Sequence, residues 1–335
     1  MEPKMTAAAA ARFLGVTVQA VHKKLKKRDL LFGKRENRVF FGHDTARQLF
    51  EIPFALNHRV IALQIVKGGP GKSTITKSIA VCANLHGAKI LVIDLDQQGN
   101  LTRDFMPKRN DTPVMIDIVN GDASIEDAIV TIGPGLDLLP SRLDNSVLDN
   151  VIMLKSLPLD RVYRELIDTV KDRYDLVLID CPPALSQSTA AAALAADLVI
   201  APVAPEPYCL DGLKMTTNEL KSLEKRYKQK VPLKVVLNKY NHSKALSREI
   251  FQELVKHDYF SQRLFKTVIR DSQEFPNAAS EYRSIFCILK ETIAKEDIEA
   301  LTREVLEITN FRTADPDLFI PLGSLEENQP LQASL

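Results

Sequence analysis

Residues 67–74 form a short run of glycines, lysines and hydroxyl side chains directly after an apolar stretch, residues 60–66. The run reads Lys67, Gly68, Gly69, Pro70, Gly71, Lys72, Ser73 and Thr74. Glycines allow consecutive backbone N–H groups to converge on an anion, and the positive end of a following helix dipole stabilises negative charge there. The lysine of such a loop contacts the β- and γ-phosphates of a nucleotide, and the next hydroxyl binds Mg²⁺. The run therefore predicts a nucleotide-phosphate site, with Lys72 and Ser73 in these two roles.

Two other apolar runs end in carboxylates. Residues 90–93 precede Asp94 and Asp96, and residues 176–179 precede Asp180. Ligands of open parallel sheets bind beyond the carboxyl ends of the strands, so acids at these positions would point into the nucleotide crevice. Phosphoryl transfer to water needs a phosphate cradle, a metal ion and a group that positions the water. The three segments together predict an Mg²⁺-dependent ATPase, and no Ser/His/Asp set competes with this interpretation.

The phosphate run resembles the deviant Walker A motif of the ParA/MinD family of ATPases, because it carries a lysine at each end, Lys67 and Lys72. Where the ordinary phosphate-loop pattern has its first glycine, this chain has Val66. Residues 94–100 resemble the family's Walker A′ motif, with Gln97 in the place of a proline. The segment that ends in Asp180 is similar to its Walker B motif.

This resemblance implies roles for individual residues. Lys67, Lys72 and Asp96 would take part in catalysis, with Asp96 orienting the attacking water and Lys67 reaching across a dimer interface to the partner's nucleotide. Ser73, Asp94 and Asp180 would hold Mg²⁺. Asn238 follows an expected strand, where it would either meet the adenine ring or form a simple turn. The residues expected to bind ATP or ADP are Lys67, Gly68, Gly69, Gly71, Lys72, Ser73, Thr74 and Asn238.

Composition is consistent with one large α/β core and a smaller second domain, since the chain has 335 residues of which 45% are apolar. The net charge of +1 is unevenly distributed: residues 1–58 hold eleven Lys and Arg against five acids, an excess of six positive charges. The four cysteines form no close pair, which favours reduced thiols in a cytosolic protein. No apolar stretch approaches the roughly 20 residues of a membrane span.

The basic N-terminal segment has the pattern of a helix-turn-helix. An alanine-rich helix over residues 6–14 would turn at Gly15, and Thr17 would cap a second helix through Leu25. Residues 31–41 predict a hairpin with a basic tip, as in a winged helix, and Asp44 would cap a closing helix over residues 45–52. A small helical cap would show the same spacing, but the concentration of positive charge favours DNA. The predicted DNA contacts on the second helix are Gln19, His22, Lys23 and Lys24.

From residue 58 to about residue 309, strand-like and helix-like runs alternate, which predicts a mainly parallel, twisted sheet flanked by helices, the α/β core of a P-loop NTPase. Residues 264–270 resemble a late strand of the family that carries an arginine involved in non-specific DNA binding, so Lys266 and Arg270 are further candidates. The expected domains are a helix-turn-helix domain over 1–56, an ATPase domain over 57–312 and a flexible acidic tail over 313–335. The expected helices are 72–85, 159–171, 210–227, 243–256 and 295–308, and the other expected strands are 136–139, 198–203 and 233–237.

The resemblance implies a DNA-partitioning ATPase of the ParA type. An ATP-bound homodimer would bind non-specific nucleoid DNA in the cytoplasm. A ParB-type centromere-binding adaptor would stimulate hydrolysis, so that a plasmid or chromosome is segregated, and the N-terminal domain would repress the operon at an operator site. Residues 325–335 lack the basic amphipathic helix with which MinD-type relatives bind membranes. Two alternatives remain open: a nucleotide-modulated transcriptional repressor without a motor role, and a positioning ATPase for a protein cargo.

Overall fold

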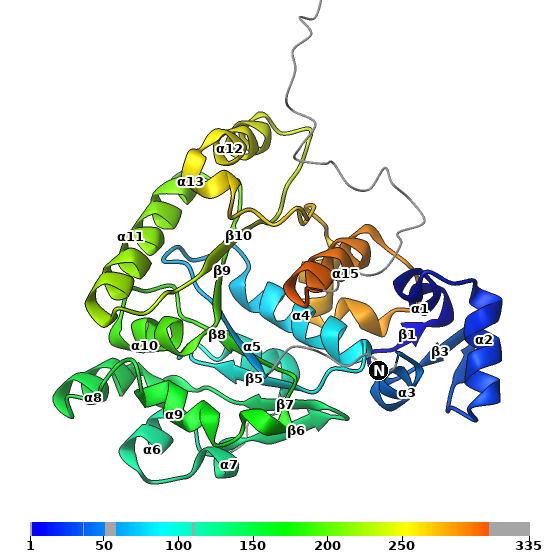
Figure 1. The fold of residues 1–335 in the computed structure, drawn as a ribbon, viewed down its shortest axis with the longest axis horizontal. Coiled ribbons are helices and arrows are strands. Elements are labelled where there is room, and N and C mark those ends of the chain that lie inside the picture. The colour runs from blue at the N-terminus through cyan, green and yellow to red at the C-terminus, as the bar shows by residue number, and fades with distance from the viewer. Residues whose placement is uncertain (1, 36, 51–57, 109–110, 308–335) are drawn as a thin grey trace, which may run out of the picture.

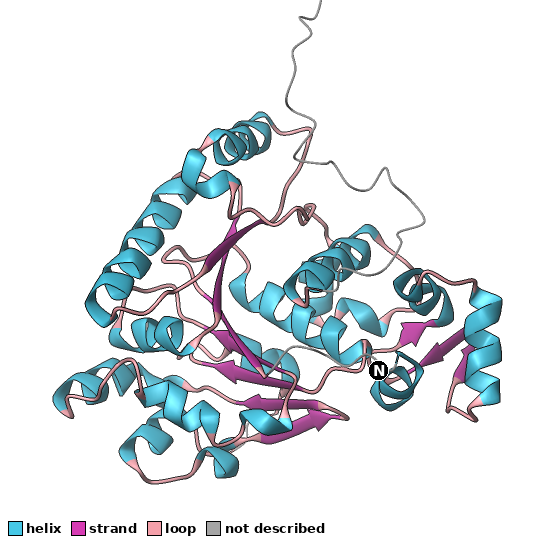
Figure 2. Cartoon of the chain, in the orientation of Figure 1, coloured by secondary structure: helices cyan, strands magenta, loops and turns pink. Residues whose placement is uncertain are grey.

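The computed structural model describes residues 2–35, 37–50, 58–108 and 111–307. Its centre is a seven-stranded sheet with the strand order β10–β9–β4–β8–β5–β7–β6, in which every neighbouring pair is parallel except β6 and β7 (Figures 1 and 2). The strands are β4 (Arg59–Leu63), β5 (Ile90–Asp94), β6 (Val130–Gly133), β7 (Leu136–Leu139), β8 (Leu176–Asp180), β9 (Leu198–Val203) and β10 (Leu233–Leu237). The predicted α/β fold with a mainly parallel sheet is confirmed.

Helices cover both faces of this sheet, which explains why its strands are apolar on both sides. Ile61 and Leu63 of β4 face the cluster that contains α4 (Lys72–Leu85) and α15 (Ile293–Val305), whereas Val60 and Ala62 face the opposite cluster. The helices on that opposite side are α6 (Met115–Asn120), α8 (Leu148–Leu154), α9 (Val162–Asp168), α10 (Gln187–Ala195), α11 (Cys209–Tyr227) and α12 (Ala245–Lys256) (Figure 1). No helix within the described ranges is long and apolar enough to cross a membrane.

The strand predicted over residues 264–270 is wrong. This segment makes two isolated bridges, Val235 of β10 with Leu264, and Tyr240 just after β10 with Arg270. One further hydrogen bond, from the Ile269 N–H to the Leu237 carbonyl at 2.8 Å, lies between them. Between the bridges, two of its backbone N–H groups donate to the carboxylate of Glu304 on α15, at 2.9 Å from Lys266 and 2.7 Å from Thr267. Because a side chain takes these donors, the segment has no continuous ladder with the sheet. The remaining short elements are α5 (Asn100–Phe105), α7 (Ile125–Ala128), α13 (Asp258–Ser261), α14 (Glu274–Ser280), η1 (Leu143–Val147), η2 (Lys171–Arg173) and η3 (Ile285–Cys287).

The described residues of the first 50, here called the N-terminal unit, follow the predicted order of two helices, a hairpin and a third helix. Thr6 and Thr17 cap the first two helices by accepting hydrogen bonds from the backbones of Ala9 and Ala20, and Gly15 makes the turn with φ 63°. Asp44 is not the cap of the third helix, because that helix begins one residue earlier. The elements are β1 (Met5–Thr6), α1 (Ala7–Leu14), α2 (Val18–Lys27), β2 (Gly33–Arg35), β3 (Arg38–Phe41) and α3 (His43–Phe50).

The N-terminal unit shares a hydrophobic core with the face of the sheet that α4 covers. The Phe13 ring is fully buried, with its centroid 4.1 Å from that of His86 at the end of α4 and 4.9 Å from that of Phe50. Arg47 donates to the Gly87 carbonyl at 2.6 Å and to the Asp175 carboxylate at 2.8 Å, next to the amino ends of β5 and β8. The unit therefore packs at the amino edge of the sheet. The predicted domain boundary at 56–57 and the acidic tail at 313–335 lie outside the described residues.

We expect His86 to make stability depend on pH. Burial lowers the pKa of His86 to about 4, against about 6.5 in an unfolded chain. Between pH 4 and pH 6.5 the folded state therefore binds fewer protons than the unfolded state. The contribution of His86 to the free energy of unfolding is complete above pH 6.5 and is lost as the pH falls toward 4. Replacing His86 by Phe keeps a ring against Phe13 and should flatten this dependence by up to about 1.4 kcal/mol per pH unit.

Urea denaturation at pH 7 and pH 5 gives the free energy of unfolding at each pH. The slope of this free energy against pH is then compared between the wild type and the His86→Phe variant. His22→Phe on α2 is the matched control, because His22 is only half-buried. The control should keep the wild-type slope. Parallel slopes for the wild type and His86→Phe would contradict this account.

Candidate active site

The phosphate loop lies between β4 and α4, as the sequence predicts. Gly69 and Gly71 have φ values of 90° and 92°, a region that favours glycine, and Gly71 caps α4. The side-chain amide of Asn238 donates to the Pro70 carbonyl at 2.7 Å. A Cβ atom on residue 71 would lie 2.4 Å from that amide nitrogen. Asn238 is thus buried against the loop and holds its backbone.

Lys72 is placed to meet a phosphate. It is the first residue of α4, its side chain is nearly buried, and its Nζ makes one long hydrogen bond, 3.5 Å to the carbonyl of Lys67. Burial lowers the pKa of Lys72, while the carboxylates of Asp180 and Asp96 act against this shift. An ammonium group that is removed from water and has few donor contacts would be stabilised by an anion.

Asp94 and Asp180 lie side by side at the carboxyl ends of β5 and β8, where they form a register pair. Both are fully buried, and burial raises the pKa of each, with the neighbouring carboxylate adding to the effect on Asp94. Asp180 Oδ1 accepts from the Thr76 hydroxyl at 3.2 Å, and its Oδ2 has no partner among the described residues. An orphaned carboxylate oxygen next to the Ser73 and Thr76 hydroxyls fits Mg²⁺, which prefers oxygen ligands and keeps several waters.

Asp96 is half-buried on the turn between β5 and α5. Its Oδ1 accepts from the backbone of Gln98 at 3.0 Å, and its own N–H donates to Asp94 Oδ1 at 3.0 Å. Its charge acts on Lys72, so the two side chains belong to one site. Gln97, which replaces the proline of the family pattern, is exposed and leaves this turn intact.

Lys67 does not point into its own phosphate loop. Its Nζ donates to the Pro207 carbonyl at 2.6 Å and lies 3.3 Å from the Glu206 carboxylate, on the loop that follows β9. Lys239 approaches the same carboxylate at 3.9 Å and donates to the Gly69 carbonyl at 2.8 Å. The two lysines of the phosphate run therefore occupy different places, with Lys72 inside the cradle and Lys67 beside it.

Several residues of the site were missed by the sequence analysis. Thr216 on α11 accepts from the Val66 N–H at 3.1 Å and so anchors the start of the loop. Thr76 contacts Asp180, Glu206 contacts Lys67, and Thr102 contacts Asp94. Thr76 stands one turn after Lys72, which is a usable signal because residues four apart share a helix face. Thr102 lies only eight residues after Asp94. Thr216 and Glu206 come from distant segments and carry no local signal.

The predicted DNA contacts are dispersed. Gln19 and Lys23 are exposed on α2, and His22 is half-buried there, but Lys24 turns toward α3 and donates to the Leu49 carbonyl at 2.9 Å. Lys266 is exposed. Arg270 pairs with Asp297 at 2.5 Å through Nη2, and its side chain remains 41% exposed. The two groups lie apart, one on the N-terminal unit and the other beside β10 and α15 (Figure 1).

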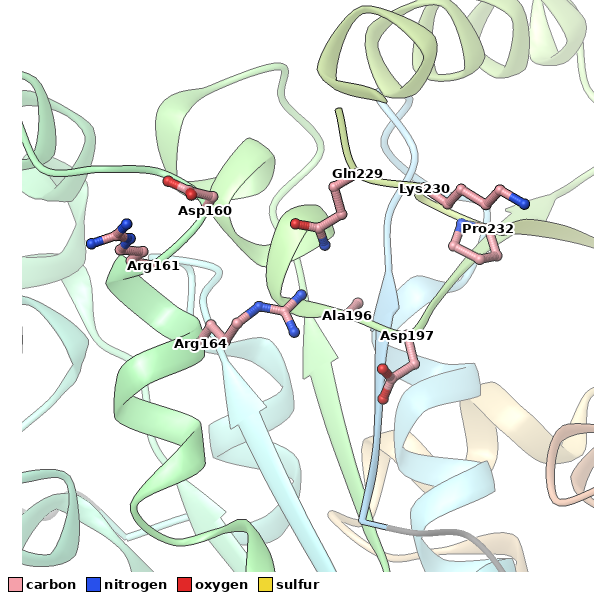
Figure 3. A pocket seen from close by; sticks show the side chains of 8 residues that line it. All are labelled: Asp160, Arg161, Arg164, Ala196, Asp197, Gln229, Lys230 and Pro232. Atoms are coloured by element: carbon pink, nitrogen blue, oxygen red, sulfur yellow. The ribbon is translucent and has the colours of Figure 1, made fainter. Parts of the chain in front are cut away.

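A hollow of about 610 Å³ at the amino edge of the sheet is separate from this site. The residues that line it precede β9 and β10 or lie at the start of α9 (Figure 3). The phosphate loop, between β4 and α4, is at the carboxyl edge. Within it, Arg164 and Gln229 both donate to the Leu194 carbonyl. The hollow is lined by Asp160, Arg161, Arg164, Ala196, Asp197, Gln229, Lys230 and Pro232.

Comparisons with known proteins agree with this geometry. Residues 58–233 match a family model described as an AAA domain. The chain is 29% identical over 230 residues to the sporulation initiation inhibitor protein Soj of Bacillus subtilis, covering 68% of this chain and 90% of Soj. It is 30% identical over 254 residues to a ParA family protein of Chlamydia trachomatis, covering 74% of this chain and 97% of the relative.

The fold is also that of a solved structure. A putative plasmid partition protein from Borrelia burgdorferi bound to AMPPNP superimposes with a TM-score of 0.62 at 20% identity, over 75% of this chain and 99% of the other. The cradle, the two buried carboxylates and the hydroxyl groups fit ATP, ADP and Mg²⁺ as the ligands of this site. Bound Mg²⁺ would neutralise phosphate charge, and Asp94, Asp180 and the Ser73 hydroxyl are the groups that would hold it. The chain therefore belongs to the ParA family and is an ATPase.

Proposed function

We propose that this protein partitions DNA: its ATP-bound homodimer binds nucleoid DNA in the cytoplasm, and a ParB-type adaptor stimulates hydrolysis and release. The observation that carries the proposal is the position of Lys67. Lys67 lies outside its own cradle, at the carboxyl edge of the sheet, and would serve a second nucleotide when it leaves Glu206. ATP would then join two subunits, and its hydrolysis would separate them.

The surface around Lys67 supports association of two copies. Exposed apolar side chains lie on the loops that leave the carboxyl ends of β7, β8 and β9, the same edge that carries the phosphate loop. Leu143 is 70% exposed and Tyr208 is 81% exposed, and Val147 and Leu185 are also exposed. Exposed apolar residues that gather at one edge are typical of an interaction surface. A face-to-face dimer would cover them.

The N-terminal unit supports a second, sequence-specific DNA contact. Lys23, Lys26 and Lys27 are exposed on α2, and the basic hairpin of β2 and β3 follows. A helix that enters the major groove and a basic wing on the phosphates would together read an operator. Autorepression of the operon through this unit is part of the proposal.

We expect the two DNA-binding surfaces to be separable by mutation. The double variant Lys23→Ala/Lys27→Ala should lose operator binding and keep ATP-dependent binding to random DNA. Lys266→Ala should weaken binding to all sequences alike and lower the slope of log K against log salt by about 1. Mobility shifts on an upstream fragment and on its scrambled version, with ADP and with ATP at several salt concentrations, measure both effects.

Point variants are preferable to deletion of residues 1–58, because the deletion would remove the Phe13 ring that packs on His86. Lys230→Ala, an exposed lysine at the amino edge, is the charge-matched control. Equal losses on both DNAs for both variants would mean one shared surface. Absence of ATP-dependent binding to random DNA would refute the partitioning proposal.

A transcriptional repressor without a motor role is the second candidate, because the N-terminal unit packs directly on the end of α4, the helix that begins at the phosphate loop. Such a protein would bind the operator fragment in a nucleotide-dependent way and would show no response of hydrolysis to an adaptor. The mobility shifts above and an ATPase assay with the adaptor distinguish the two candidates.

A further inference from the structure

The carboxylate of Asp94 is already held by the protein before any metal ion binds. Its Oδ1 accepts from the Asp96 N–H at 3.0 Å. Its Oδ2 accepts from both the backbone N–H and the hydroxyl of Thr102, at 2.9 and 2.7 Å. Asp94 therefore connects two parts of one turn: the backbone of Asp96 on one side and the first turn of α5 on the other.

Thr102 is itself anchored. Its hydroxyl donates to Asp94 and accepts from the Ser141 N–H at 2.8 Å, which uses its one proton and one of its lone pairs. Ser141 follows β7, and its own hydroxyl accepts from the amide of Asn145, whose oxygen accepts from the backbone of Ile116. Asp94, Ser141 and Asn145 are buried, and Thr102 is half-buried. The chain of hydrogen bonds thus ties the turn to the neighbouring strand and to α6.

We propose that Thr102 is a positioning residue for ATP hydrolysis. Its hydroxyl fixes the Asp94 carboxylate, and Asp94 in turn fixes the backbone of Asp96, so that the acid assigned to the attacking water keeps one orientation. This inference rests on the proposed role of Asp96. Thr102 reaches the nucleotide site through Asp94, so its loss should act on the placement of Asp96, while Lys72 and the glycines of the loop still bind the phosphates.

The chemistry of the side chain makes the proposal specific. Valine has the shape of threonine without the hydroxyl, so Thr102→Val removes the donor to Asp94 and leaves the buried Ser141 N–H without its acceptor. Thr102→Ser keeps the hydroxyl and removes only a methyl group. The two variants therefore separate the loss of the hydrogen bonds from the loss of packing.

The test compares kcat, ATP affinity and local amide exchange in the full-length protein. Thr102→Val should lower kcat at least about tenfold, because a displacement of about 1 Å in a catalytic group costs up to about 10²-fold. Its affinity for a fluorescent ATP analogue should stay within about twofold of the wild type. Hydrogen exchange of the peptide over residues 94–100 should become faster. Thr102→Ser should restore both kcat and the slow exchange.

Thr217→Val is the matched control, because Thr217 is a buried threonine whose hydroxyl only donates within its own helix. It should change neither kcat nor exchange at residues 94–100. If Thr102→Val fails to fold, Thr102→Cys, a weak donor of similar size, replaces it. Asp96→Ala is measured in parallel: hydrolysis that survives in that variant refutes the role of Asp96. If Asp96→Ala loses hydrolysis but Thr102→Val keeps the wild-type kcat, the positioning role of Thr102 is overturned while the role of Asp96 stands. A Thr102→Ser variant that fails to restore kcat would overturn the positioning role as well.

Discussion

Lys72→Ala should abolish ATP binding and hydrolysis together, with a loss of affinity of at least about 100-fold. Lys72 is only 7% exposed and makes a single long hydrogen bond, so the phosphates would be its main partners. A hydrogen bond to a charged group contributes about 1.5–3 kcal/mol, and this ammonium would make more than one. Titration calorimetry or a fluorescent ATP analogue measures the affinity, and phosphate release measures the turnover.

The same variant should not destabilise the protein without nucleotide. Burial lowers the pKa of Lys72, because its charged form has lost most of its contact with water. Without nucleotide, alanine at this position should therefore keep or raise the melting temperature. The increase in melting temperature that ATP produces should disappear.

Lys77→Ala is the matched control, since Lys77 is a buried lysine on the same helix whose pKa is also lowered by burial. Lys77 is paired with Asp104 at 3.2 Å and donates to the Arg283 carbonyl at 3.0 Å. Its removal should lower the melting temperature and leave ATP affinity unchanged. Weakened ATP binding in Lys77→Ala and normal binding in Lys72→Ala would show that the cradle has been assigned to the wrong lysine.

Local patterns were sufficient to predict much of the core. The helix after the phosphate loop has the predicted bounds, and so do the strands over residues 136–139, 198–203 and 233–237. Strands buried on both faces are continuously apolar, and a helix that follows a glycine turn has a defined start. The pairing of Asp94 with Asp180 also follows from local sequence, because both end parallel strands and therefore meet at one edge.

Contacts between distant segments could not be predicted in this way. Lys67 meets a carbonyl 140 residues away, and Arg270 is neutralised by Asp297 on another element. The strand expected over residues 264–270 failed for the same reason, since the acid that takes its N–H groups lies on α15. The N-terminal unit has the local pattern of a separate domain, yet Phe13 and Phe50 pack on a histidine of the core. In each case the decisive partner is set by the tertiary fold.

Lys67→Ala should bind ATP as a monomer and fail to form the ATP-dependent dimer. In the structure the Lys67 ammonium contacts the Pro207 carbonyl and Glu206, and it makes no contact with the cradle that Lys72 lines. Its removal therefore costs a surface ion pair, for which the expected loss of stability is below about 1 kcal/mol. ATP affinity of the single subunit should stay within about twofold, because the glycines and Lys72 remain.

Analytical ultracentrifugation with ATP and the Asp96→Ala background, in which hydrolysis is expected to be slow, measures the dimer without turnover. With ATP, the Asp96→Ala variant should sediment as a dimer. The Lys67→Ala/Asp96→Ala double variant should sediment as a monomer at the same protein concentration. Lys230→Ala removes an equal charge at the opposite edge and should dimerise normally. Because Lys67 leaves Glu206 when it serves a second subunit, Glu206→Gln should favour the dimer at lower ATP concentration. A normal ATP-dependent dimer of Lys67→Ala would exclude a role for this lysine across the interface.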